Sequence, residues 1–146
     1  MTQISRRILN KQVEEQIFET LWEAVSQVRD KKDVQIFLGD LLTPTERVMI
    51  AKRLAIAVLL LKQKDYETIK DFLKVSNETI SKVSLILKMN NGYKIAINKI
   101  IRTEAGRQFW RDIENLLYRF SAPGKVFLPE EVVKYKLGHH KKKTLV

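Results

Sequence analysis

Residues 65–89 of this 146-residue chain read DYETIKDFLKVSNETISKVSLILKM and give the strongest indication of its fold. The apolar spacing predicts a short helix at 65–73 and a second helix at 77–89, with a three-residue turn between them. Three apolar residues of the second helix share one face and are expected to be buried: Ile80, Val83 and Leu87. Two short helices joined by a tight turn are typical of a helix-turn-helix.

A plain helical hairpin with a solvated polar face produces the same pattern, because such pairs occur throughout all-helical proteins. Acidic side chains also lie close to the turn, where their charge opposes a phosphate backbone: Glu67, Asp71 and Glu78. This stretch alone therefore leaves two interpretations open, a DNA-binding motif and a structural hairpin.

The segment before the helical pair contains a clear helix start at Thr43-Pro44-Thr45-Glu46. Thr43 is a suitable N-cap, Pro44 fits the first helical position, and Glu46 completes a capping box. From there the sequence predicts a helix to about Lys62 that is apolar on most of its surface. We expect this helix to be buried at the centre of the molecule.

Further helices are predicted on both sides of this region. Their expected ranges are 10–28, 34–42 (a short helix or turn after a polar break at 31–33), 93–101 and 105–120. The first of them has a wide apolar stripe with Phe18 and Trp22, which needs a partner from the same chain or from a second copy. Asn90-Asn91-Gly92 is expected to end the helix predicted at 77–89, because Asn and Gly tolerate the left-handed conformation.

The positive charge of the chain increases toward its C-terminus. The formal net charge is +10; residues 1–60 hold nine basic and eight acidic groups, whereas residues 121–146 hold six and two. We expect a break at 121–124, a short helix opened by Pro129, and a disordered basic tail at 138–146. A basic field attracts nucleic acid without specifying its sequence, although it also serves solubility or binding to other polyanions.

The composition argues against several classes of protein. The chain has no cysteine, which removes disulfides, thiolate metal sites and cysteine nucleophiles. Its two histidines, His139 and His140, are adjacent in the tail, so we expect no metal site, no cofactor and no enzymatic activity. Residues 1–19 lack the apolar core of a signal peptide, and the longest apolar stretch, 54–61, is far shorter than a membrane span. We therefore expect a cytoplasmic protein.

The second helix of the pair would read base edges with its N-terminal half if it enters the major groove. The candidate DNA-binding residues are Lys70, Asn77, Glu78, Thr79, Ser81, Lys82 and Lys88. We expect Thr79 to reach a phosphate, and the lysines that flank this surface to contact the DNA backbone.

Residues 40–47 (DLLTPTER), 53–56 (RLAI) and 79–82 (TISK) lie in one segment, about 38–90, that resembles the tryptophan repressor family without a gap. The resemblance implies an all-α fold, an intertwined homodimer, and a transcription regulator, specifically a repressor, that binds double-stranded DNA. We accordingly expect a repressor-like helix-turn-helix domain at 1–92, a C-terminal helical extension at 93–137, and the basic tail.

The corepressor pocket of that family is matched only in part. Thr43 and Arg53 stand where the family has Thr and Arg, and they are candidate effector-pocket residues together with Lys82 and Val83. Lys82 replaces an Arg whose planar guanidinium stacks on the indole, and Val83 replaces a Gly that leaves room for the ligand. We therefore expect that tryptophan is not the corepressor, and any effector stays unidentified.

A second hypothesis is a helical interaction protein or RNA-associated factor that binds through the basic C-terminal region. It rests on the tail at 138–146 and on the acidic residues beside the predicted recognition helix.

Overall fold

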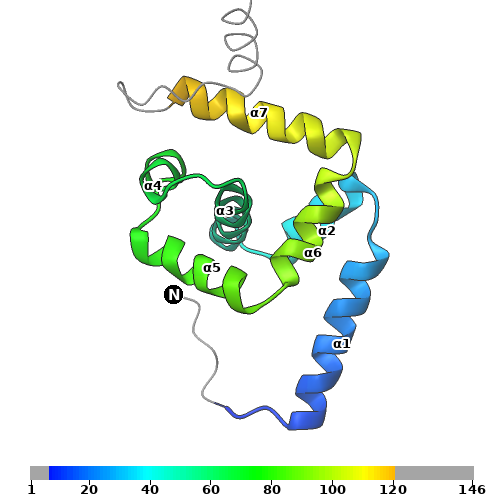
Figure 1. Ribbon diagram of the computed structural model, residues 1–146. Coiled ribbons are helices and arrows are strands. Elements are labelled where there is room, and N and C mark those ends of the chain that lie inside the picture. The colour runs from blue at the N-terminus through cyan, green and yellow to red at the C-terminus, as the bar shows by residue number, and fades with distance from the viewer. Residues whose placement is uncertain (1–6, 121–146) are drawn as a thin grey trace, which may run out of the picture. The chain divides into compact units, whose positions relative to one another are not determined.

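The computed structural model describes residues 7–120, and this part of the chain is entirely helical (Figure 1). Its helices are α1 (Lys11–Gln27), α2 (Lys31–Leu41), α3 (Pro44–Leu61), α4 (Tyr66–Leu73), α5 (Asn77–Met89), α6 (Gly92–Ile101) and α7 (Glu104–Phe120). The predicted all-α fold is confirmed. None of these described helices combines the length and the apolar character that crossing a membrane requires.

The chain divides inside α3 into two compact units, one up to Val48 and one from Met49 onward. The domain boundaries expected at residues 92 and 137 stay predictions. The expected break at 121–124, the short helix at Pro129, and the basic tail with its two histidines lie outside the described residues.

Side-chain caps set the starts of α1 and α2 in the first unit. Asn10 Oδ1 accepts a hydrogen bond from the backbone N–H two residues further on at 2.9 Å, and Asp30 Oδ1 does the same at 2.8 Å. Each cap satisfies an N–H group that has no partner within its helix. Because Asp30 caps α2, the helix begins at Lys31, and the predicted polar break at 31–33 is wrong.

The capping box at the start of α3 is present as predicted. Glu46 N–H donates to Thr43 Oγ1 at 3.3 Å, and Thr43 N–H donates to Glu46 Oε2 at 2.8 Å. The Thr43 hydroxyl donates to the same carboxylate oxygen, also at 2.8 Å. These hydrogen bonds, that of the Thr43 backbone first, hold the pKa of Glu46 below its ordinary value. Thr43 is therefore engaged in starting the helix.

The apolar stripe of α1 is exposed. No residue of this helix is buried, and Trp22 is 57% exposed. Phe18 and Trp22 stack on each other, with ring centroids 5.8 Å apart. A hollow of about 410 Å³ with a mainly apolar lining lies beside Phe18, between α1 and α2. The first unit thus presents an aromatic apolar surface.

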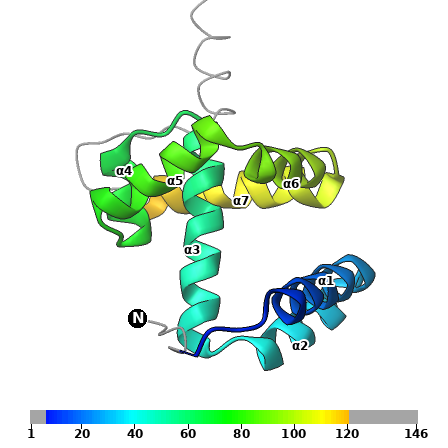
Figure 2. The same cartoon turned by 90° about the horizontal axis from the view of Figure 1, so that it is seen from below.

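The second unit is organised around the C-terminal half of α3. Figure 1 looks along α3 and shows α4, α5, α6 and α7 around it, and Figure 2 shows the same helices from the side. Their buried apolar cluster consists of Ile56, Ala57, Leu59, Ile69, Ile80, Val83, Leu87, Ile97 and Leu117. Met49, Ile50 and Leu54, nearer the start of α3, are exposed. The expectation that α3 is buried at the centre of the molecule is therefore confirmed only for its last turns, which contain the buried residues Ile56, Ala57 and Leu59.

The turns after α3 and α4 each use a residue with left-handed backbone, Gln63 (φ 60°) and Lys74 (φ 51°). At the second turn, the backbone N–H groups of Lys74 and Val75 both donate to the carbonyl of Lys70. Asn90, by contrast, is extended (φ −128°) where α5 ends. The predicted end of α5 at Met89 is confirmed, whereas the left-handed backbone expected at residues 90–92 is wrong, and Gly92 begins α6.

A tight corner joins α6 to α7. The Thr103 hydroxyl donates to the carbonyl of Ile100 at 2.8 Å and accepts the N–H of Gly106 at 3.0 Å. Gly106 is buried, and a Cβ atom on it would lie 1.9 Å from the Ile100 carbonyl oxygen. Backbone atoms line this contact, so a larger residue forces the corner apart.

We expect Gly106→Ala to lower the free energy of unfolding by about 1–3 kcal/mol, because the added methyl overpacks the corner. Chemical denaturation followed by circular dichroism measures the change. Gly92→Ala is the matched control, since a Cβ there meets no atom within 4 Å and Ala favours the helix. Equal stability of the Gly106→Ala variant and the wild type would contradict the role given to this corner.

Candidate nucleic-acid interface

Two side-chain caps position the helical pair α4–α5. Asp65 caps α4, with Oδ1 accepting the N–H of Thr68 at 2.7 Å and Oδ2 accepting its hydroxyl at 3.1 Å. Ser76 caps α5, with Oγ accepting the N–H of Thr79 at 3.2 Å. Thr68 and its neighbour Ile69 are buried. Both helices are therefore fixed at their first turns and anchored in the core.

The two faces of α5 differ as the sequence predicts. Its buried residues are Ile80, Val83 and Leu87. The candidate DNA-binding residues with exposed side chains are Lys70, Asn77, Glu78, Ser81, Lys82 and Lys88. Thr79 is half-buried, and its hydroxyl lies 3.0 Å from that of Ser76, within the cap. A phosphate contact by Thr79 stays a prediction.

An ion pair lies on the exposed face of α5. Lys82 Nζ is 2.8 Å from Glu78 Oε1, one helical turn apart, and the two side chains are 72% and 75% exposed. The hydrogen bond from Lys82, followed by its positive charge, holds the pKa of Glu78 below its ordinary value. The charges of Glu78 and Lys82 thus offset each other at this place on the helix.

The turn before α5 receives a contact that local sequence patterns do not reveal. Lys52 Nζ on α3 donates to the backbone carbonyl of Lys74 at 3.4 Å. The two residues are 22 positions apart, so helical periodicity gives no signal for this pair. The contact ties the turn of the helical pair to the central helix.

The four candidate effector-pocket residues differ in their surroundings. Val83 is 3% exposed and belongs to the buried cluster, whereas Arg53 is exposed. Lys82 forms the ion pair on α5, and Thr43 forms the capping box of the first unit. The side chain of Val83 therefore occupies core volume.

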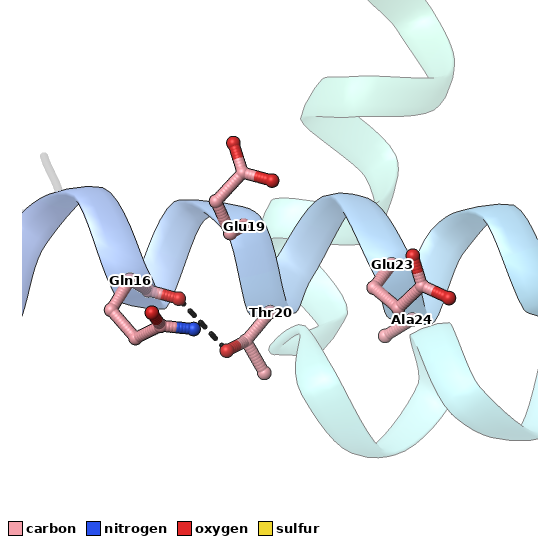
Figure 3. A pocket seen from close by; sticks show the side chains of 5 residues that line it. All are labelled: Gln16, Glu19, Thr20, Glu23 and Ala24. Carbon is pink, nitrogen blue, oxygen red and sulfur yellow. Dashed lines mark hydrogen bonds between the residues drawn. The ribbon is translucent and has the colours of Figure 1, made fainter.

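Three hollows in the described chain are lined by none of these four residues. The one of about 540 Å³ in Figure 3 is lined by five residues of α1 only: Gln16, Glu19, Thr20, Glu23 and Ala24. Its side chains come from a single helix and include two carboxylates, which disfavour phosphate. The second, between α1 and α2, is mainly apolar, and the third, of about 390 Å³, is wholly apolar and lies among α3, α6 and α7. Arg53, Lys82 and Val83 line none of the three.

Comparison with known proteins gives one family. The Trp repressor protein family matches residues 16–101, which include α2 to α6 and most of α1. No curated protein matches the chain, and no solved structure matches it. The family match covers more than half of the sequence and contains the whole helical pair. The chain therefore belongs to the Trp repressor protein family.

Proposed function

We propose that this protein is a sequence-specific DNA-binding transcription regulator, a repressor, with α5 as its recognition helix. The family is one of DNA-binding helical regulators rather than enzymes. The observation that carries the proposal is the division of α5 into a face held in the core and an exposed polar face with Asn77 and Ser81. A recognition helix needs both properties, because its base-reading side chains must be accessible and rigidly placed.

The charges around the helical pair support binding to the DNA backbone. Lys70 on α4, Lys74 in the turn and Lys88 on α5 have exposed side chains. Lysine contacts to phosphates supply sequence-independent affinity and fix the register of the protein on the duplex. We place this function in the cytoplasm, with double-stranded DNA as the partner.

Selection from a random DNA library tests the proposal. We expect the wild type to enrich one motif, and the double variant S81A/K82A to lose preference for it by about 10- to 100-fold, since base contacts are removed. Lys99→Ala on α6, also an exposed lysine, is the control and should keep the motif.

Two results would contradict the proposal. One is a wild type that enriches no motif. The other is a preference that survives S81A/K82A while deletion of residues 138–146 abolishes binding, which would favour the second hypothesis of a factor that binds through its basic tail.

We also propose that DNA binding by this protein does not use tryptophan as corepressor. Val83 fills its place in the core, and the Lys82 ammonium lies against Glu78 at 2.8 Å. A ligand at this place would have to displace a buried side chain from a close-packed cluster.

Isothermal titration calorimetry of the wild type with L-tryptophan is expected to give no binding heat at millimolar ligand. The DNA affinity is likewise expected to be the same with and without tryptophan, because α5 is already held by its own core residues. A sub-millimolar dissociation constant for L-tryptophan would overturn this expectation.

We further propose that the protein acts as a homodimer. Its aromatic stripe on α1 and the wholly apolar hollow among α3, α6 and α7 are apolar surfaces of a kind that marks interaction sites. A symmetric dimer would present two copies of α5 to successive major-groove faces of the DNA.

Sedimentation equilibrium tests the dimer. We expect the wild type to have twice the monomer mass and Trp22→Ser to shift the equilibrium toward monomer, because Trp22 supplies a large apolar contact area. Glu15→Ser, on the same exposed helix, is the control and should stay dimeric. A wild type that is monomeric at high micromolar concentration would refute the dimer.

A further inference from the structure

The ion pair between Glu78 and Lys82 contributes little to the stability of α5. Both side chains are more than two-thirds exposed, and ion pairs in water contribute little to folding. The pair nevertheless occupies the N-terminal half of the helix that is proposed to enter the major groove, where side chains meet base edges. The pair is therefore placed to contact DNA rather than to stabilise the fold.

Glu78 restricts how α5 meets DNA. Its carboxylate is repelled by phosphates, so its favourable partners in a groove are hydrogen-bond donors on base edges. The Glu78 carboxylate is ionised at neutral pH and can only accept hydrogen bonds, and the adjacent Lys82 holds its pKa below the ordinary value. Lys82 Nζ, in contrast, only donates. The pair thus presents one acceptor and one donor 2.8 Å apart.

A G·C base pair presents the complementary groups in the major groove. Cytosine N4 is a donor, and guanine O6 is an acceptor that is hydrogen-bonded to it, so the two atoms lie roughly 3 Å apart. Guanine N7, beside O6, is a second acceptor for the ammonium. Glu78 on cytosine N4 and Lys82 on guanine O6 would therefore bind without breaking their own ion pair.

An A·T base pair fits the ion pair less well. Adenine N6 and thymine O4 also form a donor and an acceptor side by side. However, adenine N7 is an acceptor next to N6 and repels the carboxylate, while the thymine methyl group next to O4 gives the ammonium no partner. The neighbouring groups therefore favour G·C over A·T.

We propose that the Glu78–Lys82 ion pair reads a single G·C base pair in the DNA target, with Glu78 on cytosine and Lys82 on guanine. This inference rests on the proposed DNA-binding function and assigns one position of the target sequence to two named side chains.

The double variant E78K/K82E tests the proposal directly. It exchanges the positions of donor and acceptor on α5. We therefore expect the selected motif to change at one position from G·C to C·G, with guanine and cytosine exchanged between the two DNA strands. Its net charge equals that of the wild type, so the salt dependence of binding should stay the same. Glu78→Gln should shift the preference at that position toward A·T, because Gln recognises adenine N6 and N7.

Selected sequences and competition binding on the four base pairs at that position give the readout. We expect the wild type to prefer its G·C pair about 10- to 100-fold over A·T. Asp71→Asn on α4 is the control, since it also removes one exposed carboxylate and should leave the preferred pair unchanged. Thermal unfolding of each variant verifies folding, and the charge exchange keeps an ion pair on α5 even if Glu78→Gln unfolds.

The possible failures are distinguishable. A wild type that selects no motif would refute the DNA-binding function and this inference together. A wild-type motif that both Glu78 variants select unchanged would overturn the base-reading role alone and leave the DNA-binding function in place.

Discussion

One cluster of nine buried apolar side chains connects the five helices of the second unit. Every helix from α3 to α7 contributes to it, and α5 contributes three residues, Ile80, Val83 and Leu87. Burial of such side chains is the main favourable term in folding. The exposed face of α5 is consequently oriented by the residues on its opposite side, so the placement of the candidate interface and the stability of the unit have the same physical origin.

The part of the chain beyond the family match takes part in this cluster. The match ends at residue 101, yet Leu117 of α7 is fully buried, and Gly106 packs against the backbone of α6. Lys62, just after α3, lies with its Nζ 4.6 Å from the ring centroid of Trp110, a favourable cation–π distance. Helix α7 is thus integrated with the matched segment.

Local patterns in the sequence predict the helices well, because caps and buried helix faces depend on residues that are close together in the sequence. The capping box at Thr43 and the buried face of α5 depend on residues within one or two helical turns, and both are confirmed. The start of α2 is harder to predict, because three charged residues in a row resemble a loop, whereas Asp30 before them caps the helix. The end of α5 at Met89 is predicted correctly, but the left-handed backbone expected after it is wrong, because Asn tolerates that conformation without requiring it.

Long-range features around the candidate interface have no local signal in the sequence. Lys52 reaches the turn carbonyl of Lys74 from another helix, and the exposure of the apolar residues of α3 before Ile56 depends on which elements cover them. The Glu78–Lys82 pair differs from these features, because a spacing of four residues on a helix is a local signal, and both residues are among the candidate DNA-binding residues predicted from the sequence.

The burial of Val83 also bears on how a regulator of this kind receives a signal. In a regulator whose pocket binds a metabolite, the recognition helix responds directly to the concentration of that metabolite. Here Val83 belongs to the buried cluster, so under the proposed function α5 is held by the chain's own side chains and not by tryptophan. If no other small molecule takes the place of tryptophan, control acts on the number of folded molecules, through their synthesis and turnover, and the response follows the lifetime of the protein.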